Sequence, residues 1–281
     1  MKTKAILILF VSLLVLMPAF PQGKAEVIIA RRRASGGGGG SALVVRNKAT
    51  KDEGTVAAFY GYDPWGHAIN ATGDLLVLVI TSGTNTSNAT PTLVCDSASA
   101  GMTSGSCASS SLSTWTIGTT SCNVTGNSCV TFAYTCSAGA SSRYFGVKFN
   151  TGSANVDSTV TAYDITHNVS SGCRDVNWPS PFSSGTPGAT LTVPTSGSYN
   201  TAVANEIAIL GMSDDNNCDT SWTSGAAGSG FTLGPRQGTC TSMLGVTEYQ
   251  IYSSTQSGAT ATLTTGNSSG NHVAAGVMTF E

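Results

Sequence analysis

Short runs of apolar and β-branched residues, separated by clusters of Gly, Ser, Asn, Asp and Pro, follow one another along the chain from Thr55 onwards. Val, Thr, Tyr and Phe favour half-buried strands, whereas the residues between the runs form turns. Some runs alternate, with Val160 and Ala162 on one face and Thr161 and Tyr163 on the other. We predict strands at Thr55–Tyr60, Asp74–Ser82, Thr90–Cys95, Thr114–Gly118, Cys129–Cys136, Arg143–Asn150, Ser158–Ile165, Ala189–Val193, Glu206–Ser213, Phe231–Leu233, Met243–Ser253, Ala259–Thr264 and His272–Phe280.

One run, Leu75–Ile80, is apolar throughout and does not alternate, which predicts a strand buried on both faces. No helical period of convincing length occurs after residue 51. Strand runs separated by turn signals every 10–20 residues are typical of β-sandwiches, and about 230 residues suffice for one such domain. The pattern therefore predicts an all-β fold: a single antiparallel β-sandwich, jelly-roll-like, over residues 52–281.

The first 25 residues have the pattern of a cleaved secretory signal. Lys2 and Lys4 precede an apolar run, Ala5–Phe20, and small residues, Gly23 and Ala25, lie at the −3 and −1 positions of a cleavage site. The run is shorter than the roughly twenty residues of a membrane-spanning helix. We expect a secreted or cell-surface protein, with no transmembrane segment after cleavage.

The charges divide the mature chain into two parts. Residues 26–51 carry six Lys and Arg against one Glu, or +5, and residues 52–281 carry four against fourteen acids, or −10. The first part contains the apolar Val27–Ile29, the basic Arg31–Arg33 and the Gly36–Gly40 run. We predict a flexible basic arm that is either a solvated tether or docks on an acidic polymer, a membrane face or a neighbouring subunit. Nucleic acid is not expected, because three arginines make a small phosphate footprint.

Eight cysteines in an exported chain predict disulfides. They are Cys95, Cys107, Cys122, Cys129, Cys136, Cys173, Cys218 and Cys240. Eight cysteines allow 105 pairings, so the connectivity stays open. The spacing favours pairs 95–107, 122–129 and 218–240, which leave 136 and 173 for each other. No CxxC pair occurs, so a zinc site is not expected.

An acidic loop is the candidate metal site. Asp215, Asn217 and Asp219 alternate along the chain, so their side-chain oxygens can surround one hard cation such as Ca²⁺. Thr220 and Ala226 occupy the positions where an EF-hand loop needs Gly and Glu. The alternative is an ordinary surface loop held by a Cys218 disulfide. No cofactor other than calcium is expected.

Aromatic residues form the candidate carbohydrate site. Tyr60, Tyr62 and Trp65 lie in the densest aromatic cluster, and Trp222 follows the acidic loop. Aromatic rings provide the flat apolar surface on which a sugar ring stacks. The alternative is that these rings cap the ends of the sandwich.

The sequence does not point to a set of catalytic residues. Gly266–Gly270 matches G-x-S-x-G, but the string joins two strand runs instead of the strand and helix that this motif requires. The only histidines, His67, His167 and His272, stand in unrelated contexts. Glu206 and Glu248 are the remaining acid pair for glycoside hydrolysis, and sequence does not give their separation. We expect that the protein is not an enzyme.

A set of short strand entries resembles a group of uncharacterised secreted bacterial β-sandwich proteins. The matching residues are Gly73–Val77, Asn205–Ile207, Gly228–Thr232, Glu248–Gln250 and the last strand, Val273–Phe280. The resemblance covers roughly residues 55–281 and implies an exported bacterial sandwich without implying an activity. At the start of the last strand, where related chains often carry an aromatic residue, this chain has His272.

The leading prediction is a secreted, non-catalytic surface or extracellular-matrix protein that acts in adhesion or subunit assembly. Its partners would be extracellular polysaccharide or neighbouring subunits, reached through the N-terminal arm. One form of assembly adds Val27–Ile29 or Ala42–Val45 to the sheet edge of a neighbour. A carbohydrate-binding module is the first alternative, and a secreted hydrolase is the second.

Overall fold

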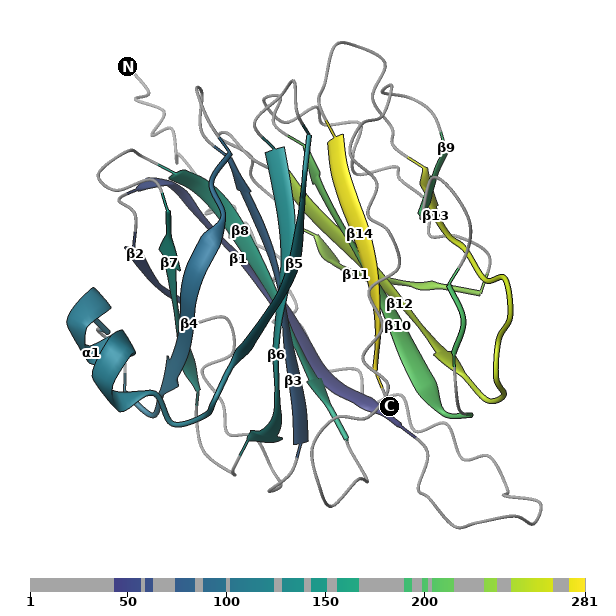
Figure 1. Cartoon of the computed structure of the whole chain (residues 1–281), viewed down its shortest axis with the longest axis horizontal. Coiled ribbons are helices and arrows are strands. Elements are labelled where there is room, and N and C mark those ends of the chain that lie inside the picture. Colours follow the sequence, from purple (N-terminus) through teal and green to yellow (C-terminus); the bar gives the residue numbers. More distant parts are fainter. Residues whose placement is uncertain are drawn as a thin grey trace, which may run out of the picture.

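A computed structural model describes the part of the chain that follows the predicted signal and most of the arm. The described residues are 43–56, 59–62, 74–83, 88–99, 102–123, 128–138, 143–150, 156–166, 190–193, 199–201, 204–214, 230–236, 244–264 and 273–280. Within them the chain is mostly strand, with one short helix, and all strand pairs are antiparallel (Figure 1). No described helix is long and apolar enough to cross a membrane.

The elements follow one another in the order of their labels, with the helix between β4 and β5. They are β1 (Val45–Val56), β2 (Phe59–Tyr62), β3 (Asp74–Gly83), β4 (Pro91–Ser97), α1 (Ser104–Ser110), β5 (Thr116–Cys122), β6 (Ser128–Ala138), β7 (Tyr144–Phe149), β8 (Val156–Ile165), β9 (Thr190–Val193), β10 (Glu206–Asp214), β11 (Thr232–Arg236), β12 (Leu244–Tyr252), β13 (Ala261–Thr264) and β14 (Val273–Phe280). The single strand predicted at Thr55–Tyr60 is thus the end of β1 and the start of β2.

Four sheets account for all of these strands. A five-stranded sheet has the order β1-β8-β3-β6-β5, and a four-stranded sheet has the order β11-β12-β10-β14. A three-stranded sheet, β2-β7-β4, and a two-stranded sheet, β13-β9, are smaller. Figure 1 shows the two large sheets in the middle of the molecule, with a small sheet on either side.

The two large sheets pack face to face through a shared buried cluster. From the five-stranded sheet it contains Leu75, Val77, Val79, Val130, Phe132, Tyr163 and Ile165, and from the four-stranded sheet Ile207, Ile209, Tyr249, Met278 and Phe280. Each fully buried aliphatic side chain of this kind contributes about 1.5–3 kcal/mol. This cluster is therefore the centre of the fold.

The outer faces of the large sheets are also covered. Leu76, Leu78 and Ile80 point away from the centre and pack with Phe145 and Val147 of the three-stranded sheet. The outer face of the four-stranded sheet packs with Tyr199 and with Ala261 of β13 in the same way. The prediction that Leu75–Ile80 is buried on both faces is confirmed, because each of its side chains is at most 1% exposed.

Small and polar residues bring the large sheets close together at one end. Ser128 Oγ and Ser213 Oγ share a hydrogen bond of 2.7 Å between the two sheets. A Cβ atom added to Gly211 would overlap Val79 Cγ1, and one added to Gly245 would lie 2.9 Å from Thr81 Oγ1. Glycine at both positions therefore permits an approach that no side chain would allow.

Part of the predicted arm belongs to the fold. Residues 45–51 are the first half of β1, which pairs with β8, so the boundary predicted between 51 and 52 falls inside a strand. The register shifts between Val45 and Asn47, and such a bulge redirects the side chain of the extra residue. Arg46 at this shift contacts the buried Asp164 at 2.5 Å. Residues 26–42 of the predicted arm lie outside the described residues.

The all-β antiparallel class and two disulfides are confirmed, whereas the sequence pattern does not predict α1. Its seven residues are mostly Ser, Gly and Ala, so they carry no apolar period. The helix begins at a capping box in which Thr103 accepts from the Ser106 amide and the Ser106 hydroxyl accepts from the Thr103 amide. Its buried residue, Cys107, is bonded to Cys95 of β4.

Candidate functional site

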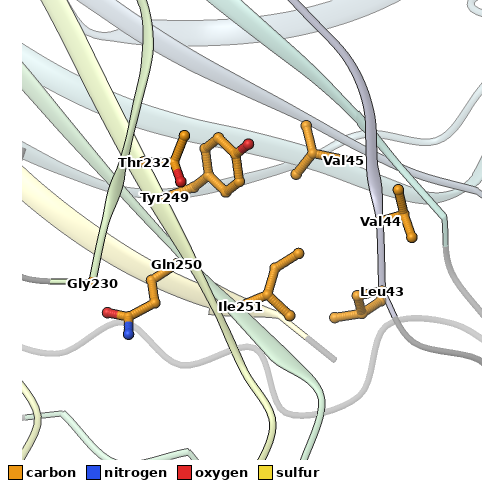
Figure 2. Close-up of a pocket in the computed structure, with 8 residues that line it drawn as sticks. All are labelled: Leu43, Val44, Val45, Gly230, Thr232, Tyr249, Gln250 and Ile251. Atoms are coloured by element: carbon orange, nitrogen blue, oxygen red, sulfur yellow. The ribbon is translucent and has the colours of Figure 1, made fainter. Parts of the chain in front are cut away.

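A groove of about 240 Å³ lies between the start of β1 and the region where β11 meets β12 (Figure 2). It is lined by Leu43, Val44, Val45, Gly230, Thr232, Tyr249, Gln250 and Ile251. Both β1 and β11 are edge strands of their sheets. The groove therefore lies between the edges of the two large sheets, at the rim of their shared core.

The β1 wall of the groove is held by the residue that follows β8, its neighbour in the sheet. The Val44 amide donates to Thr166 Oγ1 at 2.7 Å, and the Thr166 amide donates to the Val44 carbonyl at 2.9 Å. Leu43 is buried, and Val45 packs against the central cluster. This wall is consequently formed by ordered backbone that presents aliphatic side chains.

The opposite wall combines an aromatic ring with an exposed aliphatic side chain. Figure 2 shows Ile251 pointing toward Leu43, and the Tyr249 hydroxyl pointing toward Val45. Lys48 Nζ lies 5.0 Å from the centre of the Tyr249 ring and 3.4 Å from its hydroxyl. A cation over a ring is an attractive contact that fixes the ring. Ile251 is 36% exposed, which leaves an apolar side chain open to solvent at the groove.

Gly230 shapes the end of the groove. Its φ angle of +82° lies in the left-handed region that other residues rarely adopt. A Cβ atom there would lie 2.6 Å from Gln250 Nε2, so the Gln250 amide rests directly on the glycine. The β11–β12 ladder ends nearby, at the pair Thr232 and Tyr249.

Of the predicted carbohydrate residues, the two that the structure describes do not line this groove. Tyr60 and Tyr62 lie on β2 and pair with Val147 and Phe145 of β7, in the three-stranded sheet. Trp65 and Trp222 lie outside the described residues. The groove contains other residues, and the only hint of them in the sequence is that Gly228–Thr232 and Glu248–Gln250 belong to the resembling motifs.

The predicted calcium ligands Asp215, Asn217 and Asp219 lie outside the described residues. Within the part of the chain that the structure describes, no group of three or more His, Cys, Asp and Glu side chains could hold a metal ion. The three histidines and the Gly266–Gly270 string also lie outside that part.

Two of the predicted disulfides are confirmed. Cys95 bonds to Cys107 and Cys122 to Cys129, and the second bond joins directly paired residues of β5 and β6. Cys136 is also disulfide-bonded. Its predicted partner Cys173, like Cys218 and Cys240, lies outside the described residues.

Glu206 and Glu248 are fully buried on the outer face of the four-stranded sheet. The register pairs Glu206 with Tyr252, whereas it pairs Glu248 with Leu210, four residues further along β10. Close by, the hydroxyl groups of Tyr199 and Tyr252 share a hydrogen bond of 2.5 Å. The two carboxylates are buried and stand four residues apart along the sheet, so they do not face each other across an open cleft.

Buried tyrosines predict a loss of stability in alkali. Burial raises the pKa of Tyr163, Tyr199 and Tyr252 above the ordinary value. The folded protein then keeps these protons, while the unfolded chain releases them near pH 10. The contribution of these groups to stability is therefore unchanged below pH about 10 and falls above it, by at most about 1.4 kcal/mol per pH unit for the fully buried Tyr163 and by less for the other two.

Urea unfolding between pH 8 and pH 11 measures this effect. The midpoint is expected to stay constant to about pH 10 and then fall. Tyr163→Phe removes one titrating group, so its slope above pH 10 should be smaller than that of the wild type. A midpoint that does not change up to pH 11 would contradict the burial of these hydroxyls.

Comparison with known proteins identifies no relative. No protein-family model matches the chain, and neither a curated protein nor a solved structure matches it. The resemblance to secreted bacterial β-sandwich proteins thus stays a prediction from the sequence.

Proposed function

We propose that the protein is a secreted, non-catalytic extracellular protein that acts in adhesion or subunit assembly, and that the groove is its contact surface. The observation that carries this proposal is Ile251, an aliphatic side chain 36% exposed in a groove between two sheet edges. Contiguous apolar surface marks interaction sites, and in the groove Ile251 is accompanied by the half-buried Val44 and Val45.

The position of the groove favours an extended partner. An edge strand presents unpaired backbone groups, and an incoming extended segment can pair with them. The groove has such an edge strand, β1 or β11, on each side. Its side chains supply aliphatic surface from Leu43 and Ile251, and hydrogen-bonding groups from Thr232 and Gln250. This is the chemistry of strand addition with pockets for alternate side chains.

The disulfides and the packing support the rest of the proposal. Disulfides persist outside the reducing cytosol, so the Cys95–Cys107 and Cys122–Cys129 bonds agree with secretion. The two large sheets share one core, which supports the jelly-roll-like sandwich as the finer description of the fold. The donor segment Ala42–Val45 is withdrawn from the proposal, because Val45 begins β1 and Val44 is bound to Thr166. Val27–Ile29 remains as the proposed donor segment.

A charge at the groove tests the proposal. Ile251→Asp places a carboxylate on the apolar wall and should reduce self-association of mature protein by about tenfold or more, because an unpaired charge is costly to bury. Light scattering over a concentration series up to about 1 mM measures this. The matched control is Leu112→Asp, since Leu112 is the other large exposed apolar side chain of the described residues, at 52%, and follows α1.

Carbohydrate binding is the second candidate, favoured by an aromatic ring, Tyr249, and two hydrogen-bonding side chains, Gln250 and Thr232, that line the same groove. A monomeric wild-type protein whose mobility in polysaccharide affinity gels depends on Ile251 would favour this candidate over assembly. Equal behaviour of wild type, Ile251→Asp and Leu112→Asp in both assays would remove the groove as the contact surface.

A further inference from the structure

The described part of the chain begins at the groove itself. Leu43, the first described residue, lines the groove, and Val44 and Val45 continue its wall. Thirteen residues, 30–42, separate Ile29 from Leu43. Fully extended, they span at most about 43–47 Å, and as a flexible coil about 18–22 Å. Anything at positions 27–29 is thus held within easy reach of the groove.

The sequence before Leu43 contains one apolar run after the predicted cleavage site. It is Val27–Ile29, three β-branched residues suited to an extended conformation. Glu26 precedes the run, and Arg31–Arg33 and Gly36–Gly40 follow it. An apolar run bounded by charges and a glycine spacer gains free energy if it covers another apolar surface. Among the described residues, the groove between Leu43 and Ile251 offers such a surface.

The groove also offers an edge to an extended segment. The pairs between β11 and β12 end at Thr232 and Tyr249, and Gly230, with its positive φ, turns the chain there. Gln250 and Ile251 of β12 follow that last pair and line the groove. An added strand at this place would have β12 on one side and the wall from Leu43 to Val45 on the other.

We propose that Val27–Ile29 of the same chain docks in this groove as an added strand and covers Ile251. The inference rests on the proposed function of the groove as a contact surface. A flexible linker of this length gives the tethered segment an effective concentration of roughly millimolar. At protein concentrations below this effective concentration, the chain's own segment therefore outcompetes the segment of a second copy. Above it, exchange of the segment between copies is the route to assembly.

Hydrogen–deuterium exchange of the mature protein, residues 26–281, tests the docking without any partner. Peptides covering residues 26–30 and 249–252 are expected to exchange more slowly in the wild type than in Ile28→Asp or Ile251→Asp. Either substitution should increase the exchange rates of both peptides by a similar factor, since the two segments protect each other. Leu112→Asp is the matched control and should change neither peptide.

The wild-type protection should be independent of protein concentration between about 1 and 50 μM, well below the effective concentration of the tether. Protection that increases with concentration would instead identify a second copy as the occupant and overturn the proposal. Rapid exchange at residues 26–30 that is unchanged by Ile251→Asp would also overturn the docking proposal.

The two proposals fail in different ways. Removal of residues 26–35 should leave the groove open and strengthen binding of an external partner by roughly two- to tenfold, because no resident segment must be displaced. If the exchange result holds but no partner binds either protein, the proposed function fails alone. If partners bind through Ile251 but residues 26–30 show no protection, the docking fails alone.

Discussion

Asp96→Ala is expected to destabilise the protein by about 3–5 kcal/mol, the largest effect that we predict for a single substitution. Asp96 is fully buried at the end of β4, and its carboxylate lies 3.5 Å from the buried guanidinium of Arg143. The same carboxylate accepts from the Ser111 hydroxyl at 3.0 Å, and from the amide and hydroxyl of Ser113 at 2.8 Å and 2.7 Å. Removal of the carboxylate takes this acceptor away from three donors and from a buried cation.

Urea unfolding of wild type and variants measures the loss. Ser111→Ala removes only one of the hydrogen bonds to the Asp96 carboxylate, so it should cost about 0.5–1.5 kcal/mol. Asp96→Ala/Arg143→Met removes the charge with its partner and should recover part of the loss, because two apolar replacements avoid an uncompensated buried charge. A cost below about 1 kcal/mol for Asp96→Ala would show that this cluster does not fix the segment after α1.

Gly211→Val is expected to have the second largest effect, a destabilisation of about 3 kcal/mol or more, and Gly211→Ala about 1–3 kcal/mol. A Cβ atom at this position would overlap Val79 Cγ1 and lie 2.9 Å from Val130 Cγ2, across the interface of the large sheets. Val79 is β-branched and buried in the central cluster, so its methyl groups have little freedom to move aside. The sheets must therefore separate locally.

A compensating substitution distinguishes a direct overlap with Val79 from a general loss of stability caused by any change in β10. Val79→Ala removes the methyl group that the new Cβ meets, so the double variant Gly211→Ala/Val79→Ala should be more stable than the sum of the single effects predicts. The expected coupling is about 1 kcal/mol or more. Additive single effects would contradict a direct contact between these two positions.

The strands themselves are predictable because their signal is local. The run Leu75–Ile80 predicts a strand buried on both faces, and β3 has that environment since a sheet packs on each side of it. The disulfides at 95–107 and 122–129 are also predictable from the sequence, because the short spacing within each pair limits the number of plausible partners. Four stacked sheets are not predictable in this way, since alternation tells which side chains are buried but not which sheet covers them.

The predicted boundary between the arm and the β domain falls inside β1 for an electrostatic reason. Arg46 and Lys48 belong to a stretch that predicts a solvated basic arm, because the sequence does not show a partner for either. In the structure Arg46 contacts Asp164, 118 positions away, and Lys48 contacts Tyr249, 201 positions away. Charges and rings so distant in sequence are brought together only by the packing of strands from different parts of the chain.

The groove is not predictable for the same reason. Its walls come from residues 43–45, 230–232 and 249–251, which no local pattern connects. The aromatic clusters suggest a site at Tyr60 and Tyr62 instead, because ring density along the chain is visible in a sequence whereas concavity is not. Only Tyr249 among the lining residues is aromatic.

The most direct test of the groove as the contact surface is photo-crosslinking from residue 251. A benzophenone side chain replaces Ile251 in the mature protein, a second protein carries it in place of Leu112, and both are irradiated at a concentration where the wild type self-associates. We expect intermolecular products from position 251 and few from position 112. Equal yields from both positions, or none from position 251, would contradict this expectation.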